Sequence, residues 1–240
     1  MLLAVPSSLA GRTTVSSVIQ RLIVALGESD CEDLGRGFLA QPVNALSSLA
    51  FSVLGVVVLV SVSKWHGRER ANRVVFGTLM VGTGIGSFLF HGPQGSVSHF
   101  LHDVTFILAL LSVAVINLGG IVTWSTRKAS ALLGAMGIVV TAALVLWPSS
   151  TNVIAGLAVL ALVVADVALH RSTIARTRWW IASLVTMAFA VLFFALGRTG
   201  GPICDSDSLF QGHALWHVLS AFALWIYFET TTPARTGSGQ

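Results

Sequence analysis

The sequence predicts an all-α protein, a bundle of seven membrane-spanning helices. Of its 240 residues, 54% are hydrophobic and only 10% are charged, whereas soluble domains carry about 25% charged residues. Apolar runs close to the ~20 residues that cross the hydrocarbon core alternate with short polar or Gly/Pro-containing loops. Because a backbone in lipid must satisfy its hydrogen bonds within the segment, these runs are predicted to be helices and not strands.

The predicted bundle occupies residues 38–230, between an N-terminal segment, 1–37, and a tail, 231–240. Apolar residues recur at helical spacing between Val15 and Leu26, which predicts an amphipathic helix in the outer membrane interface. The polar tail is expected to be disordered. The short PSSTN sequence leaves open whether the fourth and fifth spans are fully separate. The seven spans are 40–63, 74–91, 99–121, 131–147, 153–170, 179–197 and 212–229.

The distribution of basic residues predicts the orientation. Ten of the 14 Lys and Arg residues fall on the side that holds the loops after spans one, three and five and the C-terminus. By the positive-inside rule this side is cytoplasmic, so the N-terminus lies outside. We attribute the net charge of +4 to this asymmetry and expect no nucleic-acid partner. The ten residues are Lys64, Arg68, Arg70, Arg73, Arg127, Lys128, Arg171, Arg176, Arg178 and Arg235.

Polar residues inside the spans gather at one depth. Ionisable groups in membrane spans are costly and commonly functional. The second span runs outward, whereas the third and seventh run inward, so the end of the second and the starts of the other two share the outer leaflet. The residues there are Ser87 and His91 on the second span, His99, His102 and Asp103 on the third, and His213 and His217 on the seventh.

The histidines predict a zinc site near the extracytoplasmic leaflet. His213 and His217 lie four residues apart on one helix face, the spacing by which HExxH helices supply two imidazoles. His91 completes a set of three and leaves the fourth tetrahedral position to water, as in catalytic zinc sites. Without a metal, three imidazoles in an apolar bundle would be costly.

Several of these residues also have structural interpretations. Histidines can reach toward lipid headgroups, and a serine in GTGIGS can simply allow close helix packing. Asp103 can orient a zinc ligand instead of acting on substrate. We interpret His99 and His102 as interface residues or neighbours of the site, and we expect Asp166 and His170 to face the cytoplasm.

Three motifs resemble the alkaline ceramidase family, seven-helix membrane hydrolases within a wider superfamily that includes receptors. They are GxGSxxFH, ending at His91, the aspartate Asp103, and HAxWH, from His213 to His217. Cys31 and Glu32, followed by Asn44 and Ser47, are also similar to that family. The resemblance extends from about residue 29 to residue 229.

The resemblance implies hydrolysis of a lipid amide, such as an N-acyl sphingoid base, that enters from the bilayer. His91, His213 and His217 would bind Zn²⁺, Asp103 would be the acid and base for the attacking water, and Ser87 would donate to the substrate carbonyl. Family members also bind Ca²⁺; Glu32 matches one ligand, whereas Ser29, Leu34 and Gln41 stand at other ligand positions, so Ca²⁺ binding is left open. The family's extracytoplasmic disulfide corresponds to Cys31–Cys204.

Two other functions remain as alternatives. One is a lipid-binding receptor or sensor of the same superfamily with a structural zinc ion, although such receptors place the N-terminus in the cytoplasm. The other is a metal transporter, which we rank lower because the inner half of the bundle is expected to lack ionisable groups that continue from the site.

Overall fold

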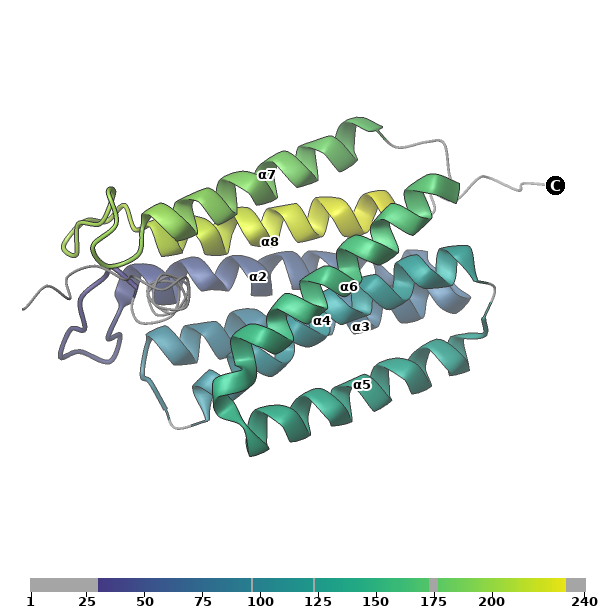
Figure 1. Ribbon diagram of the computed structural model, residues 1–240, viewed down its shortest axis with the longest axis horizontal. Helices are drawn as coiled ribbons and strands as arrows, with labels where there is room; N and C mark the ends of the chain where they lie inside the picture. Colours follow the sequence, from purple (N-terminus) through teal and green to yellow (C-terminus); the bar gives the residue numbers. More distant parts are fainter. Residues whose placement is uncertain (1–29, 96, 123, 173–176, 232–240) are drawn as a thin grey trace, which may run out of the picture.

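The computed structural model describes residues 30–95, 97–122, 124–172 and 177–231, which form an all-α bundle (Figure 1). The predicted N-terminal amphipathic helix and most of the predicted tail lie outside these residues. Short 3-10 helices follow α2 and α5. The helices are α2 (Pro42–Val60), α3 (Gly67–His91), α4 (Ser98–Ile121), α5 (Thr126–Leu146), α6 (Thr151–Ser172), α7 (Thr177–Leu196) and α8 (Gly212–Thr231).

The helices run roughly along one long axis (Figure 1). α2 packs against α3 and α8, α4 packs against α3, α5 and α6, and α7 packs against α8. The 3-10 turn Pro148–Ser150 separates α5 from α6, so the fourth and fifth predicted spans are distinct helices. Several helices extend beyond the apolar runs; α5, for example, begins at Thr126, where the Ser125 hydroxyl accepts a hydrogen bond from the Lys128 amide.

Six of the described helices, α2 to α7, are long and apolar enough to cross a membrane. Their outward faces expose many aliphatic side chains, as expected where lipid is the solvent. α8 forms as the seventh predicted run requires, but it is not among these six helices; it carries His213, His217 and Glu229. These features are those of an integral, multi-pass membrane protein.

Glycines allow the helices that carry the site to approach closely. A Cβ atom on Gly55 of α2 would lie 2.7 Å from the carbonyl oxygen of Gly77 on α3. A Cβ atom on Gly86 would lie 2.7 Å from the backbone nitrogen of His102 on α4. Small residues at helix interfaces in membranes permit this backbone contact. Gly86 precedes Ser87 directly, so the end of α3 is held against the start of α4.

An ion pair joins helices at the end of the bundle away from His91. Arg73 of α3 is 2% exposed and donates two hydrogen bonds to the Glu229 carboxylate of α8, at 2.8 and 2.7 Å. Its guanidinium also lies 4.0 Å from the centre of the Trp65 ring. Arg73 was counted among the loop charges that predict orientation, but its side chain is buried between helices.

The expectation that Asp166 faces the cytoplasm is wrong. Asp166 on α6 is 8% exposed, and its carboxylate accepts hydrogen bonds from Tyr227 of α8 and from Trp180 of α7, the latter at 3.2 Å. Asn117 of α4 donates to the Tyr227 hydroxyl at 2.6 Å. Asp166 therefore lies inside the bundle, where these donors compensate for the loss of water.

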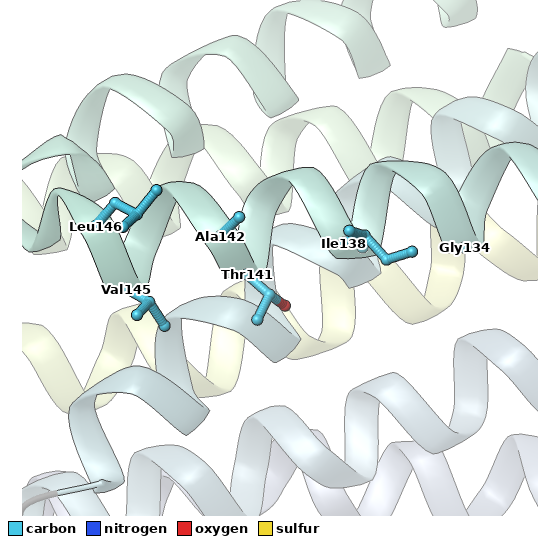
Figure 2. A pocket seen from close by; sticks show the side chains of 7 residues that line it. Gly134, Ile138, Thr141, Ala142, Val145 and Leu146 are labelled. Carbon is cyan, nitrogen blue, oxygen red and sulfur yellow. The ribbon is translucent and has the colours of Figure 1, made fainter.

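A shallow apolar groove on α5 lies apart from the polar residues of the site. Seven residues of α5 line it, and Figure 2 shows the labelled side chains Ile138, Thr141, Ala142, Val145 and Leu146 along one face of the helix. Gly134 is the first residue along α5 that lines this groove, and a Cβ atom on it would have no neighbouring atom within 4 Å. Gly134 is thus a helical glycine with free space, in contrast to Gly55.

Replacing Gly55 with alanine is expected to lower the free energy of unfolding by about 1–3 kcal/mol, because the methyl group must displace α3 backbone. The matched change Gly134→Ala is expected to be neutral or stabilising, since alanine favours helix and meets open space there. Thermal unfolding in detergent measures both. Equal destabilisation by the two variants would contradict close α2–α3 packing at Gly55.

Candidate metal centre

A disulfide ties the segment before α2 to the loop between α7 and α8. Cys31 and Cys204 are bonded, which confirms the pairing that the family resemblance implied. A β-bridge between Asp30 and Arg198 lies next to it. Asp30 and Cys31 are therefore held beside the first turn of α8.

The three histidines come together at this end of the bundle. His91 is the last residue of α3, and His213 and His217 lie in the first two turns of α8. One ligand atom from each residue lies within 4.8 Å of the other two. The ring centres are 4.9 Å apart for His91 and His213, 5.1 Å for His91 and His217, and 4.5 Å for His213 and His217. The cluster can hold a metal ion.

Hydrogen bonds of Gln41 orient the imidazole of His91. The Gln41 Oε1 atom lies 2.7 Å from Nδ1 of His91, while Gln41 Nε2 donates to the Glu32 carbonyl at 2.7 Å. Because the second bond fixes which amide atom is oxygen, His91 must donate from Nδ1. Its Nε2 atom then carries a lone pair, and it is buried without a hydrogen-bond partner among the described residues. A metal ion would satisfy this atom.

Two serines contact the two nitrogens of His217, which is 1% exposed. The Ser47 hydroxyl donates its one hydrogen bond to the Asn44 carbonyl at 3.0 Å and lies 3.1 Å from Nδ1 of His217. Nδ1 of His217 is therefore the donor in the bond between these two side chains. Nε2 of His217 is left as the ligand atom, with the Ser87 hydroxyl 3.3 Å away. Ser87 therefore lies beside the Nε2 atom of His217, and its role toward a substrate stays a prediction.

Asp30 faces His213 and His91. Its Oδ1 atom lies 2.9 Å from Nδ1 of His213, an ion-pair distance without the alignment of a good hydrogen bond. Its Oδ2 atom lies 3.7 Å from Nδ1 of His91, and Arg198 donates to Oδ1 at 2.9 Å. Burial alone would raise the pKa of the Asp30 carboxyl, but its interactions with His213, His91 and Arg198 outweigh burial and hold this pKa well below its usual range.

Asp103 lies next to the cluster without touching it. Among the described residues its carboxylate contacts Nδ1 of His102 at 2.9 Å, Nε2 of His99 at 3.3 Å and the Thr151 hydroxyl of α6 at 3.0 Å. The Phe90 ring lies 4.9 Å from the ring centres of both His91 and His99. His99 and His102 thus contact Asp103, and the contact of Asp103 with metal or substrate stays a prediction.

The residues near Glu32 do not fit a calcium site. The two Glu32 oxygens each accept a backbone hydrogen bond at 2.8 Å, from the amides of Val43 and Asn44 in the first turn of α2. Leu34 is 65% exposed and apolar, and the Gln41 amide is bonded to His91 and Glu32. Ser29 lies outside the described residues. Glu32 is accordingly a helix cap whose charge complements the α2 N-terminus.

Sequence reasoning missed the residues that orient the imidazoles. Gln41 was considered only as a calcium position, Ser47 only as part of the resemblance, and Asp30 not at all. All three lie far from the histidines in sequence. The position of Asp30 could have been predicted from the implied Cys31–Cys204 disulfide, because this bond also brings Asp30, the residue before Cys31, close to the start of α8.

The fold and the cluster together define a class: a multi-pass helical membrane protein with a three-histidine centre that can hold a metal ion. No protein-family model matches the chain, and no curated protein matches it. The resemblance to alkaline ceramidases consequently depends on the spacing of the sequence motifs alone.

Changing Glu32 to alanine is expected to lower the free energy of unfolding by about 2 kcal/mol, because two amides of α2 lose a charged acceptor. The neighbouring exposed acid provides the control, Asp33→Ala, which should have little effect. Thermal unfolding should also be unchanged by added Ca²⁺. A Ca²⁺-dependent stabilisation that Glu32→Ala removes would contradict the capping role.

Proposed function

We propose that this chain is a zinc-dependent intramembrane hydrolase of the ceramidase type, which cleaves an N-acyl sphingoid base or a similar lipid amide to a fatty acid and an amine. The observation that carries the proposal is the buried, unpartnered Nε2 atom of His91 beside two further imidazoles. An unsatisfied polar atom is costly inside a membrane protein, and a metal ion removes that cost.

The donor set favours zinc. Three neutral imidazoles with an open fourth position are the ligands of catalytic zinc sites, whereas Ca²⁺ and Mg²⁺ prefer oxygen ligands. Oxygen atoms of Gln41 and Ser47 accept from the Nδ1 atoms of His91 and His217, as acceptors behind zinc-bound histidines do. The family resemblance, which implies the same three ligands, agrees with this choice.

We further propose that α8 is the seventh span, with the N-terminus outside and the C-terminus in the cytoplasm. The metal centre would then lie near the extracytoplasmic leaflet. The Cys31–Cys204 disulfide at this end of the bundle supports that orientation, because disulfides persist in oxidising compartments. The positive-inside distribution supports it independently.

The proposed reaction divides roles among three groups. Zinc held by His91, His213 and His217 would lower the pKa of a water molecule to about 7 and polarise the amide carbonyl. Asp103 would accept the proton of the attacking water and return it to the leaving amine. The Ser87 hydroxyl would donate a hydrogen bond to the carbonyl oxygen as negative charge develops there. His99 and His102, which contact Asp103, would hold its carboxylate in place.

A membrane-embedded centre suits such a substrate. Acyl chains can enter laterally from the bilayer, while the amide and headgroup meet polar groups at the helix ends. The aliphatic outer faces of α5, α6 and α7 leave the bundle in contact with hydrocarbon. The substrate would therefore not need to leave the membrane before cleavage.

His217→Ala is expected to abolish both zinc content and amide turnover, because it removes a buried ligand. Elemental analysis of purified protein and hydrolysis of short-chain fluorescent lipid amides, with and without a chelator, measure the two effects. The control is His66→Ala, an exposed histidine that directly precedes α3, at the other end of that helix from His91. Full zinc content in His217→Ala would remove this residue from the ligand set. Zinc binding by the unaltered protein without amide turnover would favour the receptor or sensor.

Asp103→Asn and Ser87→Ala are expected to keep zinc while losing rate. General-base catalysis contributes about 10²–10⁴-fold and an oxyanion donor about 10²–10³-fold, so kcat should fall by these factors. Ser112→Ala is the control, since this buried hydroxyl bonds only within α4, to the Ala109 carbonyl. An unchanged kcat in Asp103→Asn would assign Asp103 a structural role beside His102 and Thr151.

A further inference from the structure

Asp30 is an acidic side chain that contacts two of the three histidines, yet the proposed reaction gives it no part. We propose that Asp30 is a positioning residue that sets the affinity of the metal site, and that the Cys31–Cys204 disulfide acts on the metal through Asp30. The proposal rests on the metal site of the proposed function and is independent of the substrate.

The contacts of Asp30 place its charge behind the imidazoles. One carboxylate oxygen lies 2.9 Å from Nδ1 of His213, and the other lies 3.7 Å from Nδ1 of His91. A carboxylate at Nδ1 favours the tautomer that presents Nε2 to a metal and increases the basicity of that nitrogen. Asp30 is therefore placed to orient His213 as Gln41 orients His91.

Arg198 compensates for the charge of Asp30. The two side chains are each 12% exposed and are joined by a 2.9 Å hydrogen bond, and their backbones form a β-bridge. Arg198 begins the loop that follows α7, and a Cβ atom on the preceding Gly197 would lie 2.5 Å from the Cα atom of Gly212. The guanidinium is therefore held close to the start of α8, which carries His213.

The covalent tether of Asp30 is the disulfide at the next residue. Asp30 precedes α2 and belongs to no helix. Its remaining described anchors are the contacts to Arg198 and a 3.2 Å hydrogen bond from the Thr199 hydroxyl to its carbonyl. Without the Cys31–Cys204 bond, Asp30 would be held beside the α7–α8 loop by non-covalent contacts, and the effective concentration of the carboxylate at His213 would fall.

The test is a cycle of variants of the full-length protein in detergent, stripped of metal and titrated with Zn²⁺ against a chromophoric chelator. Asp30→Asn is expected to weaken zinc binding by about 10–100-fold, the usual effect of losing an acceptor behind a metal ligand. Cys31→Ser with Cys204→Ser should weaken it in the same direction. Combining all three changes should weaken it little further, because both act through one carboxylate.

The matched control is Asp207→Asn, which removes the same charge from an exposed position in the α7–α8 loop. Thermal unfolding shows whether each variant is folded. If the cysteine variants do not fold, reduction of the folded wild-type protein followed by the same titration replaces them. Asp30→Asn, which retains both cysteines, tests the positioning role separately.

The outcomes separate this proposal from the proposed function. Wild-type affinity in folded Asp30→Asn, or fully additive losses in the cycle, would overturn the positioning role while the metal site stands. Absence of zinc binding by the unaltered protein would overturn both. The expected affinity pattern in a protein that hydrolyses no lipid amide would support Asp30 and contradict only the proposed substrate.

Discussion

A polar atom buried in a membrane bundle cannot form hydrogen bonds with water, so its partner must be supplied by the protein or by a bound ligand. This constraint organises the end of the molecule that carries His91. Gln41 accepts a hydrogen bond from Nδ1 of His91, Ser47 accepts one from Nδ1 of His217, and Asp30 lies against His213. The Nε2 atom of His91 is what these contacts leave unsatisfied. The hydrogen bonds of Gln41 and Ser47 thus leave the Nε2 lone pairs of His91 and His217 free, and one ligand atom of His213 lies within 4.8 Å of a ligand atom of each.

The opposite half of the bundle shows that buried charge alone is not a sign of a site. Arg73 and Glu229 form a two-bond ion pair, and Asp166 accepts hydrogen bonds from Tyr227 and Trp180. These groups link α3 to α8, and α6 to α7 and α8, and each charge meets its complement within the protein. The expectation that no ionisable groups continue from the site into this half stays a prediction; Arg73, Glu229 and Asp166 are bound to other groups there. Their pairing is that of structural contacts, in which one charged or polar group neutralises the cost of another.

The helices and the histidine cluster were predictable because both follow from topology. Apolar runs must become helices in lipid, and alternating direction places the end of α3 beside the starts of α4 and α8, so His91, His213 and His217 had to share a depth. Spacing could not predict which way side chains turn. Asp103 has the expected depth, but its carboxylate binds His102 and Thr151. Periodicity also could not predict that Asp30 lies beside His213. Asp30 is outside the helices, and its position depends on the neighbouring disulfide and on individual side-chain contacts.

The helix termini explain why an aspartate is useful at this place. His91 ends α3, where the helix dipole favours a cation, whereas His213 lies in the first turn of α8, where the dipole opposes one. A metal held between these two ends would meet opposing fields. The Asp30 carboxylate, 2.9 Å from His213, places negative charge at the α8 terminus and counters the unfavourable field on that side. The Arg198 guanidinium, 2.9 Å from the same carboxylate, stabilises this charge in a mostly buried position. The disulfide then has a function beyond stability, because it holds the compensating charge at the helix end where a divalent ion needs it.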